Sequence, residues 1–479
     1  MISFFVCIAL MVTSYFLYGG YVDRMFGADP KRKTPACVLG DGVDCVPLPT
    51  WKVFLIQFLN IAGLGPIFGA ILGAMYGPVV FLWITFGTIF AGAVHDYLSG
   101  MISVRSQGRS LPELIGDQLG LTVKQVMRIF TVMLMVLVGA VFVSGPANLL
   151  VGLTGGAVDY PVWVAVIFLY YIVSTVFPID KVIGRIYPFF GFALAFMAIG
   201  VGVMLMFRLG DIPELTPAGL RNMHPDAVNL PIFPMLFITV ACGAISGFHA
   251  TQSPLMARCI RTEADGKRVF FGAMVVEGIV ALIWAAAGMT FMGGVRELQE
   301  FMSANGNNPA ILVDRIARTW LGPVGGILAL IGVIAAPITS ADTGMRAARL
   351  IAAEFFKMPQ VQFWKRLAIS LPLFAVVFVL LQINFDVIWR YFAWFNQTLS
   401  VFTLWAVTVY LRKRDKNFRA TLLPGLFMTF ICSNYILISS EGLSLNPASS
   451  YVIAGAATVL CLVIFAIWSN KLKAGKSAR

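Results

Sequence analysis

The sequence predicts an all-α polytopic membrane protein with about thirteen transmembrane helices, ten of which form a 5+5 inverted repeat. Apolar and aromatic residues make up 59% of the 479 residues, and 12% are charged, against about 25% charged residues in soluble domains. The Lys and Arg residues lie in short clusters between long apolar runs. Two of these runs are interrupted by glycine and proline at positions that lie five helices apart.

This composition excludes a soluble enzyme, a disordered tail and a nucleic-acid-binding module. The net charge of +12 comes from basic clusters between apolar runs, which is the pattern of cytoplasmic membrane loops. We therefore expect a lipid bilayer as the surroundings of the chain, and no nucleic-acid partner. The sequence predicts no cofactor and no metal site.

A membrane-spanning helix needs about 20 mostly apolar residues, and this length gives thirteen candidates. They cover approximately residues 2–18, 53–77, 79–103, 126–146, 161–178, 187–207, 231–257, 269–294, 322–343, 366–381, 386–411, 419–438 and 449–470. The first run has no basic region before it and no small-residue cleavage site after it. We therefore expect a retained helix rather than a cleaved signal peptide.

The basic residues predict the orientation of the chain, because Lys and Arg in short loops stay cytoplasmic. With thirteen spans, most of the 35 Lys and Arg fall on one side. The other side holds Arg208, Arg221, Arg296, Arg315 and Arg318, and Arg390 lies inside a span. The prediction is an N-terminus outside and a C-terminus in the cytoplasm.

Two long polar stretches remain between the spans. The stretch 19–52 is cytoplasmic in this prediction, and its Cys37 and Cys45 are expected to be thiols in a reducing compartment. A metal site there would need two further ligands that the loop does not offer. The stretch 296–319 has helical spacing and is expected to lie on the outer surface.

Glycine and proline interrupt the spans 53–77 and 231–257. The first contains AGLGP at 62–66 and the second contains ACGAISGFH at 241–249. Proline lacks the N–H that a helix needs, and glycine lowers helix stability. Each interruption taken alone is also compatible with a kink or a glycine packing face, which are common in membrane helices.

Together the two interruptions indicate an inverted repeat. They are five helices apart, so the two broken helices cross the membrane in opposite directions, and interrupted helices at corresponding positions form the binding site of many transporters. The following helix carries one acidic residue in each case, Asp96 or Glu277. The predicted organisation is listed as an N-terminal helix and cytoplasmic loop, 1–52; a first five-helix repeat, 53–230; a second repeat, 231–411; and two C-terminal helices with a tail, 412–479.

Ionisable residues within the spans are candidates for proton or ion coupling, because charges in the bilayer are expensive. These candidates are His95, Asp96, His249, Glu277 and Asp342. Counted by the rise per residue, Asp96, His249, Glu277 and Asp342 lie in the inner half of the membrane, where they are able to converge below the two breaks. Structural roles stay open for three of them: a salt bridge of Asp96 with Arg105, a satisfied polar residue at a helix start for His249, and an N-cap of a helix starting at Thr343 for Asp342.

Substrate contacts are predicted at the two breaks. A carboxylate would find backbone N–H groups where the helix resumes after Pro66 and at Ser246 and Gly247, since helix N-termini favour anions. Gly63, Gly65 and His249 belong to the same predicted site. Asn396 and Gln397 are able to contribute amide hydrogen bonds, and the competing interpretation is that they join helices together.

Eight ordered segments resemble the carbon starvation protein A (CstA) family. They are IAGLGP (61–66), AGAVHDY (91–97), RSLPELI (109–115), GPANLL (145–150), PIDKVIGRIYP (178–188), CGAISGFH (242–249), DTGMR (342–346) and WRYFAWFNQT (389–398). The resemblance implies a bacterial inner-membrane transporter of the amino acid–polyamine–organocation superfamily, with the leucine-transporter-type fold and uptake of peptides or pyruvate under carbon starvation. This chain is shorter than the longest members, and it has Gln57 and Phe58 where the family often has a histidine pair.

The function predicted from these features is secondary active import of small peptides or a small carboxylate such as pyruvate. The resemblance to peptide and pyruvate uptake systems favours proton coupling. Glu277 is then the main titrating candidate, because burial raises a carboxyl pKa towards the working range, and His249 is the second, because imidazole changes charge near neutral pH. The alternative is a Na⁺ symporter in which carbonyls of the first broken helix and the hydroxyls of Thr339 and Ser340 bind the ion. The sequence has no H-E-x-x-H, G-x-S-x-G or P-loop motif, which argues against an intramembrane enzyme and against direct driving by ATP. Saturable, gradient-driven accumulation would exclude a channel. The sequence predicts no particular oligomeric state.

Overall fold

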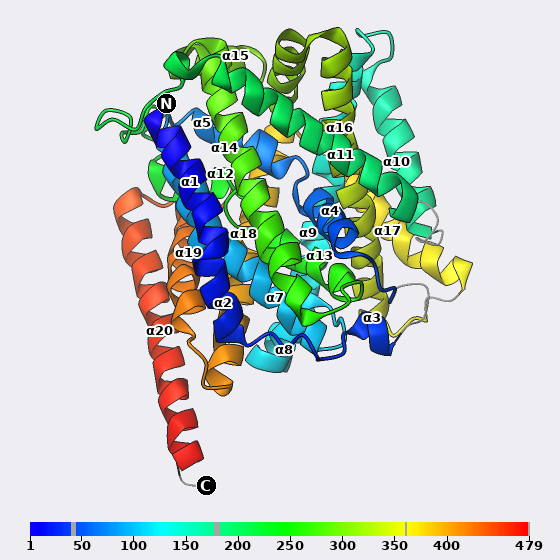
Figure 1. The fold of residues 1–479 in the computed structure, drawn as a ribbon, viewed down its shortest axis with the longest axis vertical. Helices are drawn as coiled ribbons and strands as arrows, with labels where there is room; N and C mark the ends of the chain where they lie inside the picture. Colours follow the sequence, from blue (N-terminus) through cyan, green and yellow to red (C-terminus); the bar gives the residue numbers. More distant parts are fainter. Residues whose placement is uncertain (40–44, 177–182, 360–361, 478–479) are drawn as a thin grey trace.

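The protein is an elongated bundle of helices. Its structure, a computed structural model, describes residues 1–39, 45–176, 183–359 and 362–477. Most of the helices run between the two ends of the bundle, with the N-terminus near one end and the C-terminus at the other (Figure 1). An isolated β-bridge pairs Lys33 with Thr262. Residues 177–182, which include the end of the predicted span 161–178 and Lys181, lie outside the described residues.

The N-terminal region and the first predicted repeat contain these elements. They are α1 (Ile2–Phe16), α2 (Tyr18–Phe26), α3 (Pro35–Val38), α4 (Thr50–Ile61), η1 (Gly65–Gly69), α5 (Ala70–Ala74), α6 (Val80–Phe86), η2 (Gly87–Gly92), α7 (Ala93–Arg105), α8 (Leu111–Leu119), α9 (Leu121–Leu153), α10 (Tyr160–Val176), α11 (Ile183–Met206) and η3 (Leu209–Asp211). The segments α6, η2 and α7 follow each other without a gap, so they act as one long helix that carries Asp96.

The second predicted repeat and the C-terminal region follow. Their elements are η4 (Ile232–Leu236), α12 (Phe237–Thr239), α13 (Gly247–Ala257), η5 (Glu263–Asp265), η6 (Lys267–Gly272), α14 (Ala273–Met292), α15 (Val295–Ala304), α16 (Pro309–Phe355), α17 (Phe363–Leu380), α18 (Phe385–Lys413), α19 (Arg419–Ile438) and α20 (Pro447–Ser477). In the bilayer every backbone polar group needs an internal partner, which explains why the apolar runs form helices.

Nine helices of the described chain are long and apolar enough to cross a membrane, or ten if the bent pair Thr50–Ile61 and Gly65–Ala74 counts as one span. These ten correspond to ten of the thirteen predicted spans. The other three predictions fall on α10, on the broken segment around α12 and α13, and on α18, which are not among those helices. The chain is therefore a multi-pass, all-helical membrane protein whose predicted span count exceeds the nine or ten candidates found in the structure.

The predicted surface helix 296–319 differs in detail from the structure. Its first part is α15, which lies across one end of the bundle (Figure 1). Its second part belongs to α16, a run of 47 residues that also includes the predicted span 322–343. Gly322 has a non-helical backbone with a φ of 71°, so the surface part and the spanning part of α16 are separated at this residue.

The loops with the predicted basic excess gather at one end of the bundle. Arg105 donates to Gly27 at 2.6 Å and to Glu263 at 2.9 Å. Lys413 donates to the side chain of Gln118 at 3.2 Å, and Lys416 donates to the carbonyl of Phe26 at 2.6 Å. These contacts join four loops that the charge pattern assigns to one side. Cys37 is exposed and Cys45 is buried in this region.

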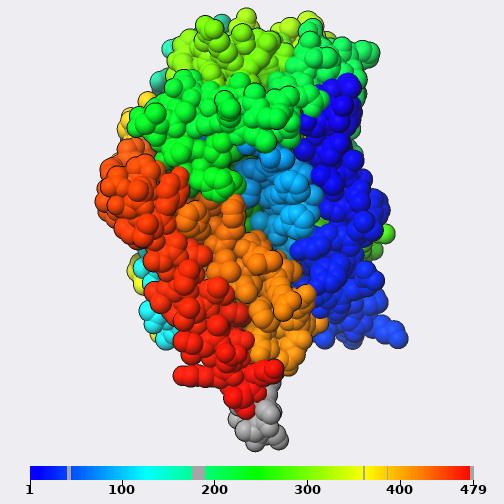
Figure 2. Space-filling view, turned by 90° about the vertical axis from the view of Figure 1, so that its left-hand side faces the viewer, coloured from blue at the N-terminus to red at the C-terminus, as the bar shows by residue number. Residues whose placement is uncertain are grey.

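The loops assigned to the opposite side also contact one another. The N-terminal ammonium of Met1 contacts the carboxylate of Glu214. Gln299 on α15 donates to the carbonyl of Met75 at 2.7 Å and to that of Met223 at 2.6 Å. The structure therefore separates the two groups of loops as the charge pattern predicts. Figure 2 shows that α19 and α20 pack along one flank, with the N-terminal helices on the other side of the same face.

Candidate functional site

The first interruption divides the predicted span 53–77. Helix α4 ends at Ile61, Ala62 leaves the helical region with a ψ of 46°, and the chain resumes as η1 at Gly65. The two helical parts are bent by 54°. Pro66 stands at the second position of η1, where its missing N–H removes no helical hydrogen bond. The sequence therefore breaks the helix at the residues where glycine and proline predicted a break.

The second interruption is longer. Helix α12 ends at Thr239, residues 240–246 are not helical, and α13 begins at Gly247. Ser246 is the N-cap residue of α13 and has extended backbone angles. The break leaves backbone groups of residues 240–246 without partners in a helix, so these groups need hydrogen-bond partners from elsewhere in the protein.

The two breaks pack directly against each other. A Cβ atom added at Gly65 would lie 2.2 Å from the Cβ of Cys242, which is too close for any side chain. A Cβ at Gly243 would lie 3.6 Å from the Cα of Pro66. The structure thus brings together the two glycine-rich segments, whose contacting residues are about 177 positions apart in the chain (242 − 65). Any side chain at Gly65 would overlap Cys242, and a Cβ atom at Gly243 would lie 2.6 Å from the Cβ of Ala281.

Helix α18 holds the second break in place through the two predicted amides. The side-chain oxygen of Asn396 accepts the backbone N–H of Phe248 at 2.7 Å and the hydroxyl of Ser246 at 3.0 Å. Gln397 donates to the carbonyls of Phe237 at 3.1 Å and Ala241 at 3.3 Å. Both amides therefore contact backbone groups of the break, as the interpretation that they join helices requires.

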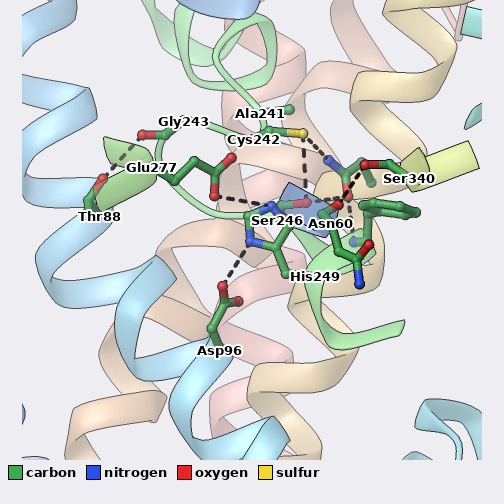
Figure 3. Close-up of polar contacts among 12 residues, drawn as sticks. Asn60, Thr88, Asp96, Ala241, Cys242, Gly243, Ser246, His249, Glu277 and Ser340 are labelled. Carbon is green, nitrogen blue, oxygen red and sulfur yellow. Dashed lines mark hydrogen bonds and ion pairs between the residues drawn. The ribbon is translucent and has the colours of Figure 1, made fainter. Parts of the chain in front are cut away.

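Three buried ionisable side chains, those of Asp96, His249 and Glu277, contact one another beside the breaks. His249 on α13 places Nδ1 2.8 Å from Oδ2 of Asp96 on α7 and Nε2 3.4 Å from Oε2 of Glu277 on α14. Asp96, His249 and Glu277 are all 0% exposed. Figure 3 shows His249 between the two acids, close to Ser246 and the second break. A carboxyl, an imidazole and a second carboxyl thus connect α7, α13 and α14.

His95 joins this group through its neighbour in sequence. Its Nδ1 lies 2.8 Å from Oδ1 of Asp96, and its side chain is fully buried. Asp96 therefore has one imidazole at each carboxylate oxygen. The two imidazoles do not have equivalent positions, because only His249 also reaches Glu277.

The remaining coupling candidates lie on α16. Ser340 Oγ lies 2.9 Å from the carbonyl oxygen of Asn60, at the end of α4, while the hydroxyl of Thr339 donates to Ala336 within its own helix at 2.8 Å. Asp342 accepts a hydrogen bond of 2.7 Å from Ser174 on α10. Of the three residues, Ser340 thus contacts the first broken helix directly.

Two structural alternatives from the sequence are wrong. Asp96 does not pair with Arg105, because Arg105 forms its ion pair with Glu263 at 2.9 Å in the loop before α14. Asp342 does not cap a helix that starts at Thr343, since α16 continues through both residues to Phe355. The first alternative assumed that Asp96 pairs with a basic residue nearby in the sequence. The second assumed that residues favoured at N-caps mark the start of a helix, although such residues also occur within helices.

Several polar residues of the site were not predicted. Thr88 donates to the carbonyl of Gly243 at 3.1 Å, and Asn396 donates to the sulfur of Cys242 at 3.3 Å. Among the described residues, buried side-chain atoms of Gln57, Asn60 and Gln252 have no hydrogen-bond partner. The sequence feature that points to these residues is that they are polar within apolar spans near the breaks. Such residues are candidates for a site, because buried polar groups normally have hydrogen-bond partners.

The described ranges contain no group of three or more His, Cys, Asp or Glu residues arranged to hold a metal ion. Carboxyl and imidazole groups in contact, as at Asp96, His249 and Glu277, are able to bind protons and to form hydrogen bonds. Because the acids and His249 are fully buried, water or a solute reaches them only when the surrounding helices move.

Comparison with known proteins identifies relatives of this chain. The family model described as "Carbon starvation protein CstA" matches residues 1–159 and 152–283. An uncharacterized membrane protein of Haemophilus influenzae is 43% identical, over 64% of this chain and 95% of that protein. The Escherichia coli protein named peptide transporter CstA is 28% identical, over 58% of this chain and 48% of that protein.

A further relative in Escherichia coli, named pyruvate/proton symporter BtsT, is 27% identical, over 58% of this chain and 47% of that protein. The chain thus spans about half the length of these two named relatives. Both carry the names of transporters, not enzymes.

Solved structures show the fold. A mutant of the Eremococcus coleocola manganese transporter is similar with a TM-score of 0.58 at 14% identity, covering 91% of this chain and 98% of that chain. The transporter MhsT in complex with L-phenylalanine gives a TM-score of 0.53 at 15% identity, covering 87% and 98%. The fold is therefore similar to that of leucine-transporter-type proteins.

Proposed function

Because the chain belongs to the carbon starvation protein CstA family, we propose that it is a secondary active importer of small peptides or of a small carboxylate such as pyruvate. The names of the relatives, a peptide transporter and a pyruvate/proton symporter, support this substrate class. Proton coupling rests on one structural observation, the buried chain of Asp96, His249 and Glu277 beside the two helix breaks.

The proposed architecture is a 5+5 inverted repeat of 53–230 and 231–411. Two features support it. The broken helices contact each other at Gly65 and Cys242, and the helix that follows each break carries a buried acid. In such repeats the substrate site lies at the interface of the two halves, and transport follows from movement of one half against the other.

The proposed substrate site lies between the breaks. The N-terminus of α13 at Ser246 and Gly247 provides a positive dipole end that favours a carboxylate. On the α4 side, the unsatisfied polar atoms of Gln57 and Asn60 would donate to or accept from a bound substrate. Asn396 acts in this proposal as a support of the α13 N-terminus, since its oxygen already accepts the amide of Phe248.

The proposal of proton coupling follows from the number of charges on the buried residues Asp96, His249 and Glu277. Among these residues, two carboxylates with one protonated imidazole would leave one negative charge uncompensated at positions without solvent exposure. An unbalanced buried charge is costly, and uptake of one proton removes it. We assign this proton to the group formed by Glu277 and His249, with Asp96 and His95 as the fixed partners on α7.

The proposed orientation places the N-terminus outside and the C-terminus in the cytoplasm of a bacterial inner membrane. The separation of the basic loops from the other loops at opposite ends of the bundle supports it, because basic loops stay cytoplasmic.

The test is uptake by proteoliposomes that contain the purified protein. We expect labelled pyruvate or a labelled small peptide to accumulate when the lumen is alkaline, with saturation at high substrate concentration. A protonophore should abolish accumulation. Linear, non-saturable flux would instead identify a channel, and accumulation of neither substrate class would refute the proposed substrates.

Sodium coupling is the second candidate, and the contact between Ser340 and the carbonyl of Asn60 at 2.9 Å favours it. A hard cation prefers oxygen ligands of this kind. On this alternative, a Na⁺ gradient at equal pH on both sides drives uptake, and Ser340→Ala removes the Na⁺ dependence. Unchanged uptake after removal of Na⁺ rejects it.

A further inference from the structure

An apolar groove lies on the outside of the helix bundle, between α1, α4 and α14. Its volume is about 460 Å³, which is within the range of ligand pockets in proteins. The groove is lined mainly by apolar side chains: Val12, Phe16, Phe54, Val275, Val276 and Ile279. We refer to these residues, with the polar residues at one end, as the α1–α14 groove.

One end of the α1–α14 groove is polar and basic. Arg268, Thr50 and Trp51 line this end, and Trp51 is 58% exposed. The ammonium of Lys267 lies 4.9 Å from the ring centroid of Tyr15, which also lines the groove. Aromatic and basic side chains of this kind mark the level of the lipid headgroups.

The charges at this end are not balanced by the nearby acids. No ion pair found among the described residues involves Arg268 or Lys267, and Glu263, an acid of the same loop, pairs with Arg105 and Arg32 instead. The neighbouring carboxylate of Asp265 instead accepts a hydrogen bond of 2.9 Å from the hydroxyl of Thr50. The polar end therefore presents two cations against one acid, and it belongs to the end of the bundle where the basic loops gather.

The length of the groove matches one leaflet of a bilayer. Arg268 and Ile279 are about 16 Å apart along the helix axis at the usual rise per residue. Half of a bilayer hydrocarbon core measures about 15 Å. A ligand with a charged group at Arg268 and an apolar chain reaching Ile279 therefore has the dimensions of a phospholipid.

We propose that the α1–α14 groove is a binding site for an anionic phospholipid, with an acyl chain against the apolar lining and the phosphate at Arg268 and Lys267. Basic pockets between membrane helices bind anionic headgroups, and the apolar lining lies between helices that are long and apolar enough to cross the membrane. This inference does not depend on which solute the protein transports.

The position of the site connects it to the transporter core. Val275, Val276 and Ile279 flank Glu277 on α14, while Val12 and Phe16 belong to the N-terminal helix outside the two repeats. A bound lipid thus packs between the N-terminal helix and the helix that carries a buried acid. It would set the position of α14 relative to α1.

The experiment is a titration of the detergent-solubilised full chain with defined lipids, read by native mass spectrometry. The probes are dioleoyl phosphatidylglycerol, dioleoyl phosphatidylcholine and the chain-free headgroup glycerophosphoglycerol. We expect phosphatidylglycerol to bind at least fivefold more tightly than phosphatidylcholine and the free headgroup not to bind. Equal affinity for the two lipids, or binding of the free headgroup, would overturn the proposal.

Variants test each part of the site. Arg268→Gln should weaken phosphatidylglycerol binding about fivefold, as expected for one cation at a headgroup, and Lys31→Gln serves as the control because Lys31 is exposed in the preceding loop and does not line the groove. Val276→Trp fills the groove and should weaken both lipids, whereas Leu10→Trp adds the same bulk to an exposed position of α1 outside it.

Ile279→Phe replaces Val276→Trp if the latter does not fold. Binding of phosphatidylglycerol that is unchanged by both Arg268→Gln and the groove-filling variant would refute the site.

Discussion

Replacement of Glu277 by glutamine tests the coupling proposal most directly. The change keeps the size of the side chain and removes one charge from the buried group of Asp96, His249 and Glu277. His249 keeps its contact with Asp96 at 2.8 Å and loses the carboxylate that lies 3.4 Å from Nε2. A permanently neutral side chain imitates the protonated state of Glu277, so the variant should bind substrate while it no longer needs a proton for the transport cycle.

The expected size of the effect follows from the one proton that the chain of two carboxyls and one imidazole accepts. A pH difference of about 1.7 units across the membrane supplies about 2.3 kcal/mol for each transported proton, at about 1.36 kcal/mol per unit. This energy supports an accumulation of about 50-fold for a zwitterionic peptide and also for pyruvate, whose anion moves together with the proton without net charge. We expect Glu277→Gln to reduce steady-state accumulation from this level to about onefold. Exchange of external against internal substrate should continue.

The assay uses proteoliposomes under an imposed proton gradient and, separately, under equal conditions on both sides with substrate in the lumen. Glu263→Gln is the matched control, because Glu263 is also fully buried but pairs with Arg105 in a loop rather than with the site. The control should lose thermal stability and keep gradient-driven uptake. Full accumulation by Glu277→Gln would refute the assignment, as would loss of exchange in a folded variant.

Three further predictions address the orientation of the protein in the membrane, the second break and the buried carboxyl of Glu113. Ala157→Cys should react with membrane-impermeant thiol reagents in intact cells and Asn417→Cys should not; the reverse pattern would invert the orientation. Asn396→Ala should lower the free energy of unfolding by about 1–3 kcal/mol, because it leaves the buried backbone N–H at the start of α13 unsatisfied. Ser400→Ala is the control: the hydroxyl of Ser400 bonds within its own helix, so its loss should lower stability less in the same thermal unfolding assay. Equal losses of stability would contradict the capping role of Asn396. Burial acts to raise the pKa of Glu113, but hydrogen bonds and charges of Lys124, Arg109 and Arg128 hold it below its ordinary value. The free energy of unfolding should therefore fall as the pH drops below the ordinary range of a carboxyl group, and Glu113→Gln should flatten this profile; a pH profile that the substitution leaves unchanged would contradict the role of Glu113.

The breaks and the buried acids were predictable because each has a local cause in the sequence. Glycine and proline interrupt a helix through their own backbone chemistry, so the interruptions near Pro66 and Gly243 are visible without knowledge of any neighbour. A carboxyl in an apolar run is likewise conspicuous by itself. Counting helices then predicted that the two breaks occupy corresponding positions of two repeats, which stays a prediction, and the structure places the two breaks in contact at Gly65 and Cys242.

The partners of these residues were not predictable, because they come from distant parts of the chain. Arg105 is nine residues from Asp96 but pairs with Glu263, which is 158 residues away. The amide of Asn396 meets the amide of Phe248 across 148 residues. Sequence periodicity carries no information on such pairs. The structure supports nine or ten of the thirteen predicted spans among the described residues, and hydropathy alone does not separate an unbroken span from short helical pieces such as α12 and α13 that are buried within the protein.

The contact geometry also decides which substitutions are able to test the site. Bulky replacements at Gly65 or Gly247 follow naturally from the sequence, yet added Cβ atoms there would lie 2.2 Å from Cys242 and 2.5 Å from the backbone of Asn396. Such variants would disturb the packing of the two breaks before they affect any bound solute. Substitutions that preserve shape avoid this problem, and His249 shows why they suffice. Its two ring nitrogens face carboxyls on α7 and α14, which belong to different proposed repeats. On the proposed mechanism, movement of one repeat against the other changes these two contacts unequally, so that the proton is held in one conformation and released in the other.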